Sequence, residues 1–130
     1  HNPHILLTAS RLDLLALLDA VRHPSHGGLA VFLGTTRDTF AAKRVVQLSY
    51  EAYISMAEQE MTRLAETAQA RWGVRVALAH RLGDVPVGEE SVAVVASSVH
   101  RREALDAVAW LIDELKARVP VWKREEYDDG

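Results

Sequence analysis

The chain has 130 residues, no cysteine and a formal net charge of −3 at pH 7. This length fits a single domain, residues 1–130, that can bury a hydrophobic core without stabilising cross-links. Because the chain has no cysteine, disulfides, thiolate metal sites and a cysteine nucleophile are excluded. The acidic balance argues against nucleic-acid binding, which needs a basic face. No apolar run reaches membrane-spanning length and no signal-peptide pattern begins the chain, so a cytoplasmic location without membrane contact is expected.

The first expected elements are a short strand over residues 5–7 and an amphipathic helix. Ser10 and Asp13 resemble a capping box for this helix, which should end before Pro24. Its predicted apolar stripe is Leu14, Leu15, Leu18 and Val21. Residues 29–33 then form a continuous apolar run, which predicts a buried strand.

A glycine-led loop, Gly34 to Asp38, follows this strand and carries Thr35, Thr36 and Arg37. Such loops bind anions when they meet another cationic element, because donors can come close where glycine lacks a side chain. A β-turn with an exposed Arg37 explains the same residues. The loop is therefore a candidate for anion binding that needs a second element.

The middle of the chain predicts a strand and a helix. Residues 45–53 alternate, which predicts a strand with one wet or partner-covered face. Its expected apolar face is Val46, Leu48, Tyr50 and Ala52. Ser55 and Glu58 form a capping box for the helix, which Gly73 closes. The expected stripe of this helix is Ala57, Met61, Leu64, Ala65, Ala68 and Trp72.

Two more strands are expected before the last helix. Residues 74–82 alternate, whereas residues 91–99 are β-branched and nearly all apolar, so the second strand should lie centrally in a sheet. Residues 83–90, between these two strands, are of types typical of turns. His80 shares a face with apolar residues, which favours a hydrogen-bonded core or boundary histidine over a catalytic one.

The stretch Ser97–Glu126 carries the strongest functional signal. Apolar residues recur there at three- and four-residue intervals, which predicts a helix capped by Ser97 or Ser98 and stopped by Pro120. Its expected stripe is Ala104, Leu105, Val108, Leu111, Ile112, Leu115 and Val119. Residues 121–125 then alternate as a short strand would.

Polar and cationic residues gather at the two ends of this last helix. His100 and Arg101 stand where it begins, and a helix N-terminus favours a phosphate or carboxylate. Lys116 stands near its end and Lys123 just past it; an ammonium group beside another cation loses its proton more easily and can act as acid, base or nucleophile. A lysine that only complements the helix dipole and a solvated histidine are the plainer interpretations.

The predicted element order is β-α-β-β-α-β-β-α-β, with helices interleaved among strands. This order predicts an α+β fold, a mixed α/β sandwich with helices over a largely antiparallel sheet. No linker rich in Pro, Gly or Ser divides the chain. One domain is therefore expected.

Several motifs in combination resemble the large, catalytic subunit of molybdopterin synthase over about residues 27–130. The motifs are FLGTTRD at 32–38, LSYEAY with Met56-Ala57 from 48, HRLG at 80–83, HR at 100–101, Lys116, and VPVWKRE at 119–125. The resemblance implies the α/β hammerhead fold and a sulfurtransferase of molybdenum cofactor biosynthesis. Such enzymes convert cyclic pyranopterin monophosphate to molybdopterin, with sulfur from the C-terminal thiocarboxylate of a small ubiquitin-like subunit.

Carried over position by position, the resemblance implies that Lys116 and Lys123 are catalytic. The implied substrate-binding residues are Thr35, Thr36, Arg37, His100, Arg101, Lys116, Lys123, Arg124 and Glu125. It further implies a homodimer flanked by two small subunits, a heterotetramer, with no metal and no cofactor. The cationic groups should meet in one anion-binding pocket, within one chain or across a twofold axis.

Two functions of other classes stay open. One is a non-catalytic scaffold that binds a ubiquitin-like protein, for which the two lysines are not needed. The other is a lysine Schiff-base enzyme acting on a phosphorylated carbonyl compound, for which one lysine would be the nucleophile.

Overall fold

A computed structural model describes residues 2–127, apart from the side chain of Glu125. The helices are α1 (Leu14–Val21), α2 (Ile54–Trp72) and α3 (Arg101–Arg118). The strands are β1 (His4–Thr8), β2 (Gly28–Thr35), β3 (Thr39–Phe40), β4 (Lys43–Ala52), β5 (Arg75–Arg81), β6 (Gly83–Pro86), β7 (Glu90–Ser98) and β8 (Val121–Tyr127). The predicted α+β class is confirmed, and β3 and β6 are short strands that the sequence does not predict.

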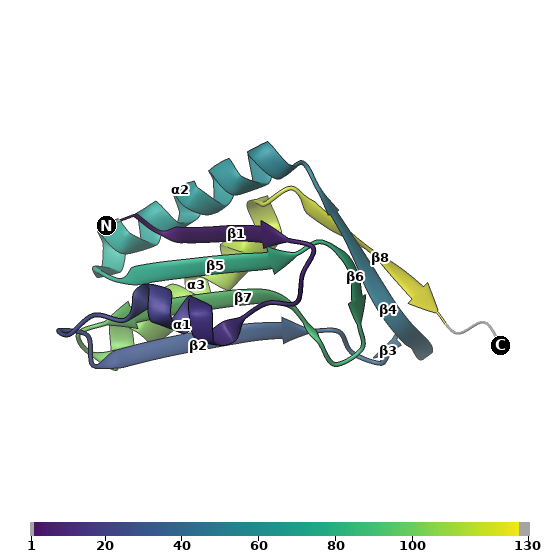
Figure 1. Ribbon diagram of the computed structural model, residues 1–130, viewed down its shortest axis with the longest axis horizontal. Coiled ribbons are helices and arrows are strands. Elements are labelled where there is room, and N and C mark those ends of the chain that lie inside the picture. The colour runs from purple at the N-terminus through teal and green to yellow at the C-terminus, as the bar shows by residue number, and fades with distance from the viewer. Residues whose placement is uncertain (1, 128–130) are drawn as a thin grey trace.

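The larger sheet has the strand order β1-β5-β7-β2 (Figure 1). Strand β1 runs parallel to β5, whereas β5 with β7 and β7 with β2 are antiparallel, so the sheet is largely antiparallel as predicted. Residues 91–98 of β7 are all buried. A strand covered on both faces needs an uninterrupted apolar run, which is why this segment lacks alternation.

Helices cover both faces of this sheet. Helices α2 and α3 pack on one face, against side chains that include Leu78 of β5 and Val94 of β7. Helix α1 packs on the other face, where Ala77, Ala79 and Ala93 point. Because successive strand residues point to opposite faces, the same two strands supply both cores.

The predicted helix stripes are largely confirmed, with two errors. Leu15 of α1 is exposed and Leu17 is buried in its place, and Leu105 of α3 is also exposed. In α2 the predicted stripe is buried except for the half-buried Trp72, and the helix ends at Gly73 in the left-handed conformation, φ 66°. Only glycine adopts that conformation at little cost, which explains why the end of α2 was predicted correctly.

The helix N-termini differ from the predicted caps. Asp13, rather than Ser10, caps α1 by accepting from the Ala16 N–H at 3.2 Å. Helix α2 follows Tyr53 and has no side-chain cap, so the predicted Ser55 capping box is wrong. At α3 the N-cap position is taken by His100, outside the predicted pair of serines.

The serines before α3 still serve its first turn. Ser98 Oγ accepts from the Ala104 N–H at 2.9 Å and donates to the His100 carbonyl. Ser97 Oγ instead donates to the Val21 carbonyl at 2.6 Å. At the other end α3 stops at Arg118, before Pro120, as predicted.

A smaller antiparallel sheet lies across one end of the larger one (Figure 1). In it β4 pairs with β3, β6 and β8. A bulge between Val45 and Gln47 in the pairing with β8 breaks the alternation of side chains. Val45 and Leu48 are therefore buried while Val46 is exposed, which corrects the predicted apolar face of this strand.

Among residues 2–127, none of the helices combines the length and apolar character needed to cross a bilayer.

Candidate active site

A pocket of about 580 Å³ opens where the end of α3 and the smaller sheet meet the larger sheet. Its volume falls in the range of small-molecule sites. The residues lining it are Gly34, Thr35, Arg37, Thr39, Phe40, Val45, Leu48, Tyr50, His80, Ser91, Val92, Ile112, Leu115, Lys116, Val119, Val121, Trp122 and Lys123. Segments that lie between residues 34 and 123 therefore line one pocket, and only folding brings them together.

Two lysines line this pocket, one on each side of Pro120. Lys116 lies in the last turn of α3, and Lys123 lies in β8 opposite Tyr50 of β4. The Lys123 Nζ lies 6.0 Å from the centre of the Phe40 ring, at the outer limit of a cation–π contact. The proline ends the helix and turns the chain into β8, so both ammonium groups reach the same cavity.

The glycine-led loop brings two of its three candidates to the pocket. Thr35 and the exposed Arg37 line it. Thr36 is 2% exposed and does not line it; its N–H donates to the Glu89 carbonyl at 3.1 Å and its carbonyl accepts from Gly88 at 2.9 Å. Its Oγ1 is buried without a hydrogen-bond partner. Thr36 thus anchors the loop, and the structure does not support its predicted contact with substrate.

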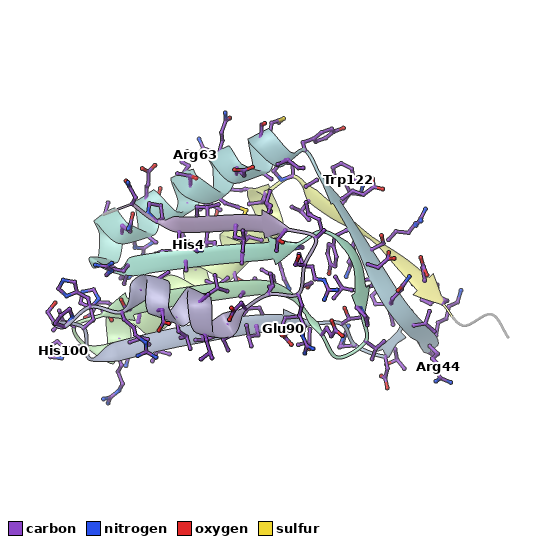
Figure 2. The ribbon with its side chains drawn as sticks, in the orientation of Figure 1. His4, Arg44, Arg63, Glu90, His100 and Trp122 are labelled. Carbon is purple, nitrogen blue, oxygen red and sulfur yellow. The ribbon has the colours of Figure 1, made fainter. Side chains whose placement is uncertain are left out.

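His100 and Arg101 do not reach this pocket in the same chain. They lie at the start of α3, and Arg101 and Lys116 are fifteen residue steps apart along the helix, about 22 Å at 1.5 Å per residue. Figure 2 shows His100 at the left end of the molecule and Trp122, another residue that lines the pocket, in its upper right part. The prediction that all these cationic groups meet in one pocket of a single chain is therefore wrong. A pocket shared between two chains across a twofold axis stays a prediction.

The last two candidates lie in β8. Arg124 lines a separate, smaller pocket of about 160 Å³ with Ser49, Glu51 and Trp122. Trp122 and Arg124 flank Lys123 in β8, and successive strand residues point to opposite faces, so Arg124 faces the other side of the small sheet. The side chain of Glu125 lies outside what the structure describes.

His80 lines the pocket although its sequence context favoured a core role. It is 5% exposed, its Nδ1 lies 2.8 Å from the Arg81 carbonyl oxygen, and its ring meets the Tyr50 ring edge-on at 4.8 Å. Burial lowers the pKa of His80 below the ordinary value of 6.5. The predicted hydrogen-bonded boundary histidine is confirmed, and the structure adds that it lines the pocket.

An ion pair holds the strand end that carries His80. Arg81 donates to Glu89 at 2.7 Å, which ties the end of β5 to the turn before β7. The hydrogen bond from Arg81 is the main reason that the pKa of Glu89 is lowered. In the part of the chain that the structure describes, no three His, Asp or Glu side chains are grouped as a metal site would need.

The fold and the pocket define an α+β protein whose lysine-lined cavity suits a small anionic ligand. The chain matches the family model described as MoaE protein over residues 7–118, and it belongs to this family. It is 49% identical over 127 residues to the molybdopterin synthase catalytic subunit of Arabidopsis thaliana, covering 97% of this chain and 64% of the relative. It is 49% identical to that of Culex quinquefasciatus, covering 98% of this chain and 82% of the relative.

Solved structures confirm the expected fold. Molybdopterin synthase from Staphylococcus aureus superposes with a TM-score of 0.92 at 28% identity, covering 95% of this chain and 91% of that one. A chain from the complex of subunits 1 and 2 of molybdopterin-converting factor from Helicobacter pylori gives 0.77 at 25% identity, covering 98% and 86%. The resemblance to the molybdopterin synthase large subunit therefore extends to the backbone.

Proposed function

We propose that this chain is a sulfurtransferase, the catalytic subunit of a molybdopterin synthase in molybdenum cofactor biosynthesis. It converts cyclic pyranopterin monophosphate to molybdopterin with sulfur from the C-terminal thiocarboxylate of a small ubiquitin-like subunit. The observation that carries the proposal is that Lys116 and Lys123 line one pocket in a member of the MoaE family. A cationic cavity suits both a phosphate and a thiocarboxylate.

In this function the cationic residues take different roles. Lys116 orients and activates the incoming thiocarboxylate, and Lys123 handles proton transfer or the negative charge that develops on the pterin side chain. Arg37 holds the phosphate at the pocket rim. The sulfur belongs to the partner, so the chain needs neither a cysteine of its own nor a cofactor.

The separation of His100 and Arg101 from the lysines supports a site shared between two copies. In a homodimer the start of α3 from one copy would complete the anion-binding set in the pocket of the other. Two small subunits would then make a heterotetramer in the cytoplasm. The Helicobacter pylori relative, described as a complex of subunits 1 and 2, supports a small-subunit partner.

The decisive experiment is to mix the purified chain with a thiocarboxylated small subunit and cyclic pyranopterin monophosphate and to measure molybdopterin. Lys116→Ala and Lys123→Ala should each lower turnover by about 100-fold or more, because a positioned proton donor or charge is lost. Arg118→Ala is the matched control: Arg118 lies in the same helix turn as Lys116 but is exposed, paired with Glu114 and away from the pocket. Unimpaired turnover in both lysine variants would refute the catalytic assignment.

The same preparation separates the two other functions. A scaffold would bind the small subunit, also without both lysines, while the wild-type chain forms no product. A Schiff-base enzyme would become covalently labelled when borohydride is added with substrate, at Lys116 or Lys123. Product formation without such labelling favours sulfur transfer.

A further inference from the structure

His80 lines the same pocket as Lys116 and Lys123, but it is buried whereas the two lysines are exposed. It lies near the end of β5, opposite Val92 of β7, and on the same face as Leu78, which packs against α2 and α3. It is 95% buried and yet lines the cavity. A polar ring in this position must either be satisfied within the protein or serve a ligand.

The hydrogen bond at one ring nitrogen determines what the other can do. Nδ1 lies 2.8 Å from the Arg81 carbonyl oxygen, and a carbonyl can only accept, so Nδ1 carries the hydrogen. Burial lowers the pKa of His80, which keeps the ring neutral near pH 7. In a neutral imidazole that is protonated on Nδ1, Nε2 is an acceptor with a free lone pair.

That second nitrogen is open to the pocket. Among residues 2–127, Nε2 has no hydrogen-bond partner, and it is not fully buried. The Tyr50 ring packs edge-on against the imidazole at 4.8 Å and limits its rotation. The ring is therefore held with one nitrogen bonded to the backbone and the other accessible from the cavity.

The charged side chains around the pocket cannot replace this group. Lys116, Lys123 and Arg37 are donors only, so they recognise the anionic parts of a ligand. A pterin ring also presents N–H groups, and these need an acceptor. A neutral imidazole offers one without adding a negative charge that would repel the phosphate or the thiocarboxylate.

We propose that His80 is a substrate-binding residue whose Nε2 accepts a hydrogen bond from an N–H group of the pterin ring. Because this role rests on the proposed function, it deepens the same site: the lysines and Arg37 bind the anionic groups, and His80 reads the heterocycle. A substrate analogue with the phosphate but without ring N–H groups would gain nothing from it.

Two substitutions separate the two ring nitrogens. His80→Asn keeps an amide N–H near the Nδ1 position for the Arg81 carbonyl but removes the acceptor at the Nε2 position. His80→Gln places an amide oxygen near the Nε2 position. Titration calorimetry with cyclic pyranopterin monophosphate, on the complex with the unmodified small subunit, should show about tenfold weaker binding for the Asn variant. The Gln variant should recover most of the affinity.

Thermal unfolding of the same samples shows whether each variant is folded, and the turnover to molybdopterin is measured beside it. Equal affinity in wild type and His80→Asn, or equal losses in the Asn and Gln variants, would overturn the substrate-binding role. Wild-type turnover in either case leaves the proposed function standing. A wild-type complex that makes no molybdopterin overturns the proposed function and this role with it.

A measurement on the wild-type protein guards against variants that do not fold. With ¹⁵N-labelled histidine, the His80 Nε2 resonance should be that of an unprotonated nitrogen and should move when cyclic pyranopterin monophosphate is added. A protonated Nε2, or a resonance unchanged by saturating substrate, would contradict the proposal.

Discussion

Gly34 marks how closely the pocket wall is packed at the level of single residues. It pairs with Val92 across β2 and β7, and a Cβ added to it would lie 2.6 Å from the Val92 Cγ1. Real Cβ atoms do not approach that closely, and the branched, buried valine cannot turn away. Contact with a neighbouring side chain, not a special backbone angle, therefore requires glycine here.

Gly34→Ala should lower the free energy of unfolding by about 1–3 kcal/mol, because the added methyl group overpacks the wall. Urea denaturation measures the change. In a Val92→Ala background the same substitution should cost much less, so the two changes should be strongly non-additive. Additive costs would show that Val92 is not the neighbour that Gly34 accommodates.

At the level of elements, two serines near helix starts have different roles despite similar sequence signals. Ser98 bonds the first turn of α3 through the Ala104 N–H and the His100 carbonyl. Ser55 lies inside the first turn of α2, which has no side-chain cap. An unpaired N–H at a buried helix start costs free energy, so only the first serine stabilises its helix measurably.

Ser98→Ala should lower the free energy of unfolding by about 1–2 kcal/mol, because Ala104 loses its hydrogen-bond acceptor. Ser55→Ala, the matched control, should change it by less than about 0.5 kcal/mol. Chemical denaturation of the two variants side by side measures both values. A larger loss at Ser55 than at Ser98 would contradict the observed caps.

At the level of the whole molecule, the length of α3 decides how a complete site can form. The helix holds His100 and Arg101 at one end and Lys116 at the other, so the proposed cationic set needs two chains. Each site would combine the lysines of one copy with the helix start of the other. A defect at either end would then be complemented by a different chain.

Mixing Lys116→Ala with Arg101→Ala protein should restore activity that neither variant has alone. After random exchange, half of the dimers are mixed and each has one intact site, so about one quarter of wild-type turnover is expected. Molybdopterin formation after co-refolding or co-expression measures it. No recovery in mixed dimers, once their formation is verified, would place both residues in sites of a single chain.

Local signals in the sequence determined much of this protein. Gly73 and Pro120 end their helices where predicted because their backbone restrictions act whatever the surroundings. Apolar spacing predicted the buried stripe of α2 and the central strand β7 because burial imposes the helix and strand periods. The helix end and the turn between Lys116 and Lys123 predicted that both ammonium groups could reach a common pocket, and both residues line it.

Tertiary structure alone decided which side chains face that pocket. Thr35 lines it while its neighbour Thr36 is buried against the turn before β7, because pairing with a distant strand sets the direction of each side chain. His80 becomes a pocket residue only when β4, β7 and α3 close around it. Sequence spacing specifies a residue's own helix or strand, but the walls of a cavity come from segments far apart in the chain, whose approach only folding sets.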